Sequence, residues 1–357
     1  MPVIRRVLLI KFGAIGDAIM AIPAAYALHG QGSEVHWVCG AAVAPLLACY
    51  TWIHPIVADD RTILQGSPAE RLKALTSLWR AIGRTKYDLC ATLYYDPRYR
   101  VLSLPVRAAR KIMLSRTARE TTLLDGRHHT DEYARILLGL TDGERPESVA
   151  PVYPDRLPAS PLPRSGNKPR VVLIPAGAKN MMRDDALRRW PMENYISLAS
   201  GLLQRGFEVV LAGGPQDTWA VPRFAGLAVI DQTGKLTLPE MVALLDDSDV
   251  VVTHDTGPLH MAGITGAGLI GIFGPTNPRG RLPQRANTVA LWGGEGFACR
   301  PCYDGRDYAP CLHNGCMHQV TAQMVLDQVE ALMAQRNAAS PRPPRIVVPI
   351  STVKAGL

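Results

Sequence analysis

The stretch Val250–Pro278, VVVTHDTGPLHMAGITGAGLIGIFGPTNP, decides the fold that the sequence predicts. It opens with three valines, which are typical of a buried strand, and the turn His254–Pro258 then breaks that strand. A small-residue helix carrying His260 follows, and after it come a second apolar strand, Leu269–Phe273, and a second tight turn, Gly274–Pro278. Two glycine-rich turns this close together can direct backbone N–H groups at one anion, most often a phosphate. The stretch therefore predicts an α/β domain that binds a nucleotide diphosphate.

The composition of the chain bounds the class of protein. It has 357 residues, of which 47% are hydrophobic and 20% charged, which suits a globular protein of two domains. The formal net charge of +8 favours anionic ligands, and the 6% aromatic content disfavours a base-stacking surface, so we expect no nucleic-acid partner.

The N-terminus resembles a signal peptide only superficially, because Lys11 and Asp17 interrupt the apolar run that follows Arg5 and Arg6. No stretch of about 18 residues lacks polar or turn-forming residues, so we expect no membrane span. Three scattered cysteines have apolar neighbours and are expected to be reduced, as in the cytoplasm: Cys39, Cys49 and Cys90.

Strands and helices alternate in both halves of the chain, which predicts two doubly wound parallel sheets. In the first half we expect strands at 7–10, 34–39, 55–58, 89–93 and 111–114, and helices at 18–29 and 68–82. In the second half we expect further strands at 170–174, 208–212 and 228–230, and helices at 192–205 and 238–245.

A proline-rich run between Tyr153 and Pro169 separates the two halves, because prolines prevent a continuous helix or central strand there. We therefore predict an N-terminal domain at 1–155, a linker at 156–169, a C-terminal domain at 170–336 and a surface tail at 337–357. Ligands of such sheets bind at the carboxyl ends of the strands.

The loop after the first strand, Gly13-Ala-Ile-Gly-Asp17, carries the first candidate residue for catalysis. A carboxylate at the mouth of the sheet could act as general base for a sugar hydroxyl. Alternatively, Asp17 caps the first helix and offsets its dipole. The loop lacks the full dinucleotide fingerprint GxGxxG.

Two loops of the second half carry candidate ligands for a nucleotide. Lys179 in PAGAKN could reach a phosphate, as could Arg188 or Arg189 in RRWP, although a solvated basic loop has the same composition. In GGPQD, Gln216 and Asp217 are placed for contact with a ribose or a base. Alternatively, Asp217 lies in the first turn of a helix.

The turn Asp255–His260, DTGPLH, is the most specific cluster. Asp255 would be repelled by a diphosphate, so we expect it to orient the turn or to bond a sugar hydroxyl, while the amides of Thr256 and Gly257 face phosphate. His260 could donate to an oxygen of the leaving diphosphate, or be a core histidine with satisfied hydrogen bonds.

Seven basic residues and no acidic one lie between positions 98 and 119: Arg98, Arg100, Arg107, Arg110, Lys111, Arg116 and Arg119. So one-sided a run suggests an acceptor that carries phosphates or carboxylates. The alternative is that these residues only form a solvated basic surface.

Four clustered cysteines have the ligand count of a structural zinc or iron site: Cys299, Cys302, Cys311 and Cys316, with His313 and His318 nearby. Two disulfides or a reduced cluster are the alternatives. We expect no catalytic role, because four thiolates leave no open coordination position.

Together these motifs resemble the ADP-heptose:lipopolysaccharide heptosyltransferase family, glycosyltransferase family 9, whose GT-B fold has two Rossmann-like domains facing across a cleft. The resemblance covers nearly the whole chain, and DTGPLH with FGPTNP is its most specific part. GAIGD, RRWP and GGPQD are weaker, and the cysteine-rich segment resembles a variant of the family.

The resemblance implies an inverting transfer, without a metal or other cofactor for catalysis, from ADP-heptose to a hydroxyl of an anionic glycan, the lipopolysaccharide inner core. Asp17 would be the base, and Leu236 would pack against the adenine. The diphosphate would be held by Lys179 or an arginine of the RRWP motif, together with Thr256, Gly257, His260 and the FGPTNP turn with Thr276. A glycolipid acceptor also implies peripheral contact with the cytoplasmic face of the inner membrane.

Two departures from the family pattern bear on these expectations. The insert Asn180–Leu187 before RRWP is long and basic, which leaves open which cation meets the phosphate, and Pro258 removes one backbone donor. Three other functions stay open on the same fold: transfer to a protein hydroxyl with the cysteines as a metal-held docking element, epimerisation of a sugar nucleotide, and nucleotide binding without catalysis.

Overall fold

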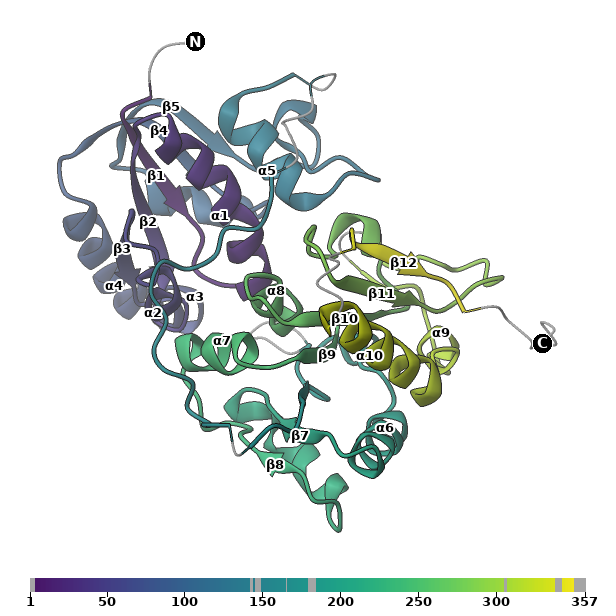
Figure 1. Ribbon diagram of the computed structural model, residues 1–357. Coiled ribbons are helices and arrows are strands. Elements are labelled where there is room, and N and C mark those ends of the chain that lie inside the picture. The colour runs from purple at the N-terminus through teal and green to yellow at the C-terminus, as the bar shows by residue number, and fades with distance from the viewer. Residues whose placement is uncertain are drawn as a thin grey trace. The chain divides into compact units, whose positions relative to one another are not determined.

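The computed structural model describes residues 4–141, 144, 149–164, 166–178, 184–304, 307–337 and 342–349. The chain divides into two compact units, Met1–Leu157 and Pro158–Leu357, and each is an α/β unit built on one parallel sheet (Figure 1). The predicted fold class is confirmed by this architecture.

The first unit has a five-stranded sheet in the order β3-β2-β1-β4-β5, with all pairs parallel. Its strands are β1 (Arg6–Ile10), β2 (Glu34–Gly40), β3 (Ile53–Ala58), β4 (Lys86–Thr92) and β5 (Arg107–Met113). Its helices are α1 (Ile15–Gly30), α2 (Ala44–Leu47), α3 (Asp60–Gln65), α4 (Pro68–Ile82) and α5 (His129–Leu138), with short 3₁₀ turns at Pro97–Ser103 and Arg119–Thr121.

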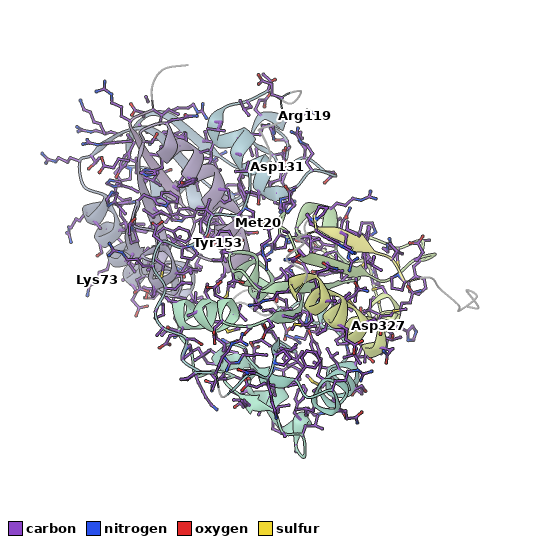
Figure 2. The ribbon with its side chains drawn as sticks, viewed as in Figure 1. Met20, Lys73, Arg119, Asp131, Tyr153 and Asp327 are labelled. Carbon is purple, nitrogen blue, oxygen red and sulfur yellow. The ribbon has the colours of Figure 1, made fainter. Side chains whose placement is uncertain are left out.

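The central strand of this sheet, β1, is buried from Val7 to Ile10, as is typical of the middle strand of a parallel sheet. Helix α4 has the predicted bounds, which follow from a capping box: the backbone N–H of Ser67 donates to Glu70 Oε2 at 2.8 Å, and Pro68 takes the first helical position. Its outer face is charged, and Lys73 lies on the surface of the unit (Figure 2).

The second unit has a seven-stranded sheet in the order β12-β11-β10-β9-β6-β7-β8, again with all pairs parallel. Its strands are β6 (Arg170–Leu173), β7 (Glu208–Leu211), β8 (Ile230–Asp231), β9 (Val250–His254), β10 (Gly268–Phe273), β11 (Thr288–Trp292) and β12 (Arg345–Val347). Its helices are α6 (Met192–Gln204), α7 (Leu238–Asp246), α8 (Gly257–Gly263), α9 (Gly315–His318) and α10 (Ala322–Asn337), with 3₁₀ turns at Ala186–Arg188, Pro215–Phe224 and Pro278–Gly280.

The core of the second unit lies between the sheet and the pair α6 and α10, which pack against each other (Figure 1). Trp190 is buried there, and its indole N–H donates to the carbonyl of Val320 at 2.8 Å. Part of the expected tail belongs to the sheet, because β12 pairs with β11 from Val289↔Arg345 to Leu291↔Val347. Within the described ranges, no helix combines the length and the apolar character needed to cross a membrane.

Candidate active site

The two turns of the deciding stretch meet at one edge of the second sheet. Strands β9 and β10 are parallel neighbours, with His254 opposite Ile272, so both turns follow the carboxyl ends of their strands. The backbone N–H of Asp255 donates to the carbonyl of Ile272 at 3.3 Å, and Thr256 is the N-cap residue of α8. The sequence placed these two turns correctly.

Asp255 is a buried carboxylate between two arginines. It is 2% exposed, and its Oδ2 lies 3.7 Å from Nη1 of Arg188 and 3.9 Å from Nε of Arg281. Burial alone would raise the pKa of Asp255, but the charges of Arg281 and Arg188, together with His260, hold it below its usual value. Asp255 therefore stays ionised and anchors two guanidinium groups beside the turns.

The two arginines of RRWP have different partners. Arg188 donates from Nη1 to the backbone carbonyl of Asp255 at 3.1 Å and pairs with the carboxylate of Asp185. Burial lowers the pKa of Arg188, but Asp255, Tyr308 and Asp185 raise it more, so its charge is permanent.

Arg189 instead reaches the end of β6, donating from Nε to the carbonyl of Gly177 at 2.9 Å, and its guanidinium lies 5.8 Å from the ring centroid of Trp219. Of the two arginines in RRWP, Arg188 is therefore the one that contacts Asp255 in the turn after β9. Lys179 lies outside the described residues.

Two histidines are buried at the same edge. His260 in α8 is 5% exposed, and its charge is one of those that lower the pKa of Asp255. His254 is fully buried, and burial, with the charges of Arg188 and Arg189, lowers its pKa to about 3. Since Tyr195 donates its hydroxyl to the carbonyl of Ile174, we assign the proton to Nδ1 of His254, 3.1 Å from that hydroxyl. His254 is thus a neutral support of the turn.

The residues expected to contact the ribose or the adenine of the nucleotide lie at the ends of neighbouring strands. Asp217 is 9% exposed and accepts from the backbone N–H groups of Gly177 at 2.9 Å and Gly214 at 2.8 Å, so it ties together the turns after β6 and β7. Gln216 is exposed, and Leu236 is partly buried just before α7. Thr276, in the turn after β10, is 2% exposed, and its hydroxyl helps to lower the pKa of Asp255.

The GAIGD loop of the first unit is held by a buried lysine. Asp17 lies in the first turn of α1, whose N-cap residue is Ala14, so Asp17 is not the capping residue. Its Oδ2 lies 3.0 Å from Nζ of Lys11, which also donates to the carbonyl of Leu93 at 3.2 Å. The side chain of Lys11 is 6% exposed and that of Asp17 is 32% exposed. The carboxylate is therefore accessible to a substrate but fixed on one side.

Tyr94 completes this support. Its hydroxyl accepts from the backbone N–H groups of Phe12 at 2.8 Å and Gly13 at 3.3 Å, and its ring lies 4.3 Å from Nζ of Lys11. The ring also stacks on Tyr99, with centroids 3.8 Å apart. Sequence reasoning missed both Lys11 and Tyr94, and the only available signal was their position at the ends of β1 and β4.

The basic run does not form one cluster. Arg98 pairs with Asp96 at 2.6 Å, Arg116 lies 4.9 Å from the ring centroid of Tyr95, and Arg100 and Arg107 are exposed. Arg110 donates to the carbonyls at the end of α5, and burial lowers its pKa. The run therefore presents separate cations on and beside β5, an edge strand of its sheet.

The four clustered cysteines are free thiols, with Cys299 and Cys311 exposed and Cys302 and Cys316 half-buried. Burial and the neighbouring thiols raise the pKa of Cys316 to about 11. In the part of the chain that the structure describes, no three His, Cys, Asp or Glu side chains are arranged to hold a metal ion. The expected zinc or iron site is therefore not supported by the structure.

Comparisons with known proteins agree with this architecture. The family model for glycosyltransferase family 9 (heptosyltransferase) matches residues 75–313. Lipooligosaccharide heptosyltransferase 2 of Haemophilus influenzae is 29% identical over 157 residues, which cover 42% of this chain and 44% of that protein, less than half of its length. The lipopolysaccharide core heptosyltransferase OpsX of the same organism is 24% identical over 307 residues, 81% of this chain and 85% of that protein.

The solved structure of Escherichia coli ADP-heptose lps heptosyltransferase II superposes with a TM-score of 0.69 at 19% identity, covering 93% of this chain and 99% of that one. This likeness shows that the two chains share the GT-B fold. Because the family model matches more than half of the chain, the protein belongs to glycosyltransferase family 9, the heptosyltransferase family.

Proposed function

We propose that this protein transfers heptose from ADP-heptose to a hydroxyl group of the lipopolysaccharide inner core, with inversion and without a catalytic metal. The pair of turns after β9 and β10, where Arg188 and Arg281 flank Asp255, is the observation that carries this proposal. The names of the relatives support the choice of substrates: one is an ADP-heptose lps heptosyltransferase, and OpsX is a lipopolysaccharide core heptosyltransferase.

In this proposal the diphosphate binds at the turns, to the amides of Thr256 and Gly257 and to Arg188, with His260 and Thr276 buried beside them. Negative charge grows on ADP as its bond to the anomeric carbon breaks, and fixed amides and guanidinium groups stabilise that charge in place of a metal. The ribose and adenine lie toward the ends of β6, β7 and β8, where the candidate contacts are Arg189, Gln216, Asp217 and Leu236. Lys179, outside the described residues, stays a candidate for the phosphates.

Asp17 is the proposed general base. It takes the proton of the acceptor hydroxyl as that oxygen attacks the anomeric carbon from the side opposite ADP, so the new glycosidic bond has inverted configuration. The ion pair with Lys11 fixes the carboxylate for this step. A positioned base contributes about 10²–10⁴-fold to the rate.

The acceptor is proposed to bind the first unit through cations on and beside β5. Exposed arginines suit the phosphates and carboxylates of an anionic glycolipid, since guanidinium groups bind both in bidentate geometry. The candidates are Arg98, Arg100, Arg107, Arg110 and Arg116. We further propose that the protein works in the cytoplasm, with peripheral contact to the inner membrane that holds such an acceptor.

The test is a transfer assay with purified protein, ADP-heptose and Kdo–lipid A, with mass spectrometry of the glycolipid. Wild type should add one heptose and release ADP only when the acceptor is present. Asp17→Asn, which keeps the shape of the side chain, should reduce kcat by about 10²-fold or more, while Asp125→Asn, an exposed carboxylate of the same unit, should not.

Equal turnover by Asp17→Asn and wild type would remove Asp17 from its role. Isomerised donor in the absence of acceptor would favour an epimerase, and ADP binding with no transfer to any acceptor would rule out a transferase.

A further inference from the structure

The described parts of the cysteine-rich segment, residues 299–304 and 307–318, pack directly against the turns of the donor unit. The backbone N–H of Tyr303 donates to the carbonyl of Pro275, in the turn after β10, at 3.2 Å. A Cβ atom at Gly274 would lie 2.7 Å from Sγ of Cys316, and one at Gly293, after β11, would lie 1.8 Å from the carbonyl oxygen of Cys316. Only glycine allows this approach, so the segment is built into the edge of the sheet that carries the proposed donor site.

One tyrosine of the segment lies against the second arginine of that edge. The guanidinium of Arg281 lies 5.5 Å from the ring centroid of Tyr303, within the range of a cation–π interaction. The same guanidinium lies 3.9 Å from Oδ2 of Asp255 and is 18% exposed. Arg281 is therefore held between an aromatic face and a buried carboxylate.

A second tyrosine of the segment packs against Tyr303. Tyr308 pairs with Tyr303 in an isolated antiparallel bridge, and their ring centroids lie 4.8 Å apart. Burial raises the pKa of Tyr308 well above its ordinary value, although the charge of Arg188 lowers it. Tyr308 is therefore a neutral phenol in the electrostatic field of Arg188, Asp185 and Asp255.

The two guanidinium groups have a geometry that suits an anionic ligand. Their ion pairs with Oδ2 of Asp255, at 3.7 Å for Arg188 and 3.9 Å for Arg281, are longer than hydrogen bonds. Asp255 thus provides charge that keeps both cations at the turns, but at these distances it does not take their N–H groups through Oδ2. Phosphate oxygens form short, charge-assisted bonds with such groups.

We propose that Tyr303 is a positioning residue that holds Arg281 beside Asp255, and that Tyr308 supports Tyr303 through the contact of their rings. The cysteine-rich segment is then one wall of a two-arginine subsite for the diphosphate, and it needs no metal for this role. The inference deepens the proposed function, because it rests on ADP-heptose as the donor.

The test compares ADP, inorganic pyrophosphate and adenosine as ligands in isothermal titration calorimetry. Arg281→Gln should lower the affinity for ADP and for pyrophosphate by about tenfold or more, because a charge-assisted contact is lost. Its affinity for adenosine should not change. Tyr303→Leu should lower the affinity for ADP by about threefold to tenfold. Tyr303→Phe, which keeps the aromatic face, should bind ADP as wild type does.

Tyr308→Leu, which removes the ring that packs against Tyr303, should also weaken the binding of ADP more than that of adenosine. Arg205→Gln is the matched control, since Arg205 is 40% exposed in the same unit and pairs with Glu330. It should bind all three ligands as wild type does.

An equal loss of ADP and adenosine affinity in Tyr303→Leu would mean a general structural role and would overturn the inference, as would unchanged ADP affinity in Arg281→Gln. Wild type that binds neither ADP nor pyrophosphate would also overturn it. Wild type that binds ADP as described but transfers no heptose would contradict the proposed function and leave the subsite standing.

Discussion

Nζ of Lys11 lies 3.0 Å from Oδ2 of Asp17, and both residues come after β1, the central strand of the first sheet, in the chain. Lys11 itself is held by the carbonyl of Leu93 and the ring of Tyr94. A buried ammonium with these contacts has one orientation, so the carboxylate that it pairs with is fixed as well.

Lys11→Met is expected to reduce kcat at least tenfold, because a misplaced base loses much of its rate contribution. The affinity for ADP should not change, since the proposed donor site lies on the other unit. Lys11→Arg should recover part of kcat. Lys73→Met is the control, because Lys73 is exposed on α4 of the same unit (Figure 2). Steady-state kinetics measure kcat, and titration with ADP measures the affinity that should stay unchanged. A full kcat in Lys11→Met would show that the ion pair has no part in the reaction.

The buried His254 should make the folded protein less stable in acid. Its pKa is about 3 in the folded protein, against 6.5 for an unperturbed histidine. The unfolded chain therefore binds more protons between these two values, and the free energy of unfolding falls as the pH drops below about 6.5. The loss is complete near pH 3 and amounts to a few kcal/mol, on the order expected for such a shift.

Denaturant unfolding between pH 4 and pH 8 measures this dependence. His254→Gln should show a shallower decline than wild type, while His54→Gln, at an exposed position on β3, should follow wild type. If wild type and His254→Gln declined in parallel, His254 would not carry the acid sensitivity.

A buried arginine at the start of β6, in the second sheet, should be important for stability. Arg170 is 0% exposed, pairs with Glu208 and lies 2.8 Å from Asp247 Oδ2. Arg170→Met should lower the free energy of unfolding of the second unit by about 3–5 kcal/mol, because carboxylates lose their buried partner.

The matched change Arg205→Met breaks a half-exposed pair and should cost about 1 kcal/mol or less. Urea denaturation followed by tryptophan fluorescence compares the two variants. If both variants lost similar free energies of unfolding, burial of the Arg170 ion pairs would add nothing to stability.

Much of the architecture follows from local patterns in the sequence. Apolar runs placed the strands, and the Ser67–Glu70 capping box fixed the start of α4. Strands β11 and β12 were missed, the latter because the prolines at 341, 343 and 344, just before Arg345–Val347, suggested a tail. Its position at the edge of the sheet makes such prolines tolerable.

The turns of the candidate site were predictable, but the partners of their side chains were not. Spacing located Asp255 and the RRWP motif, yet only tertiary packing decides that Arg188 faces Asp255 while Arg189 faces Gly177. Arg281, Tyr303 and Lys11 carry no motif of their own. The metal expectation came from ligand count alone, and spacing in sequence does not determine how four sulfurs are arranged in space.

The most direct test of the account is a crystal structure of the protein with ADP. The account predicts the diphosphate at the turns after β9 and β10, within hydrogen-bonding distance of the amides of Thr256 and Gly257 and of the guanidinium of Arg188 or Arg281. ADP bound elsewhere, with these turns free of phosphate, would contradict it.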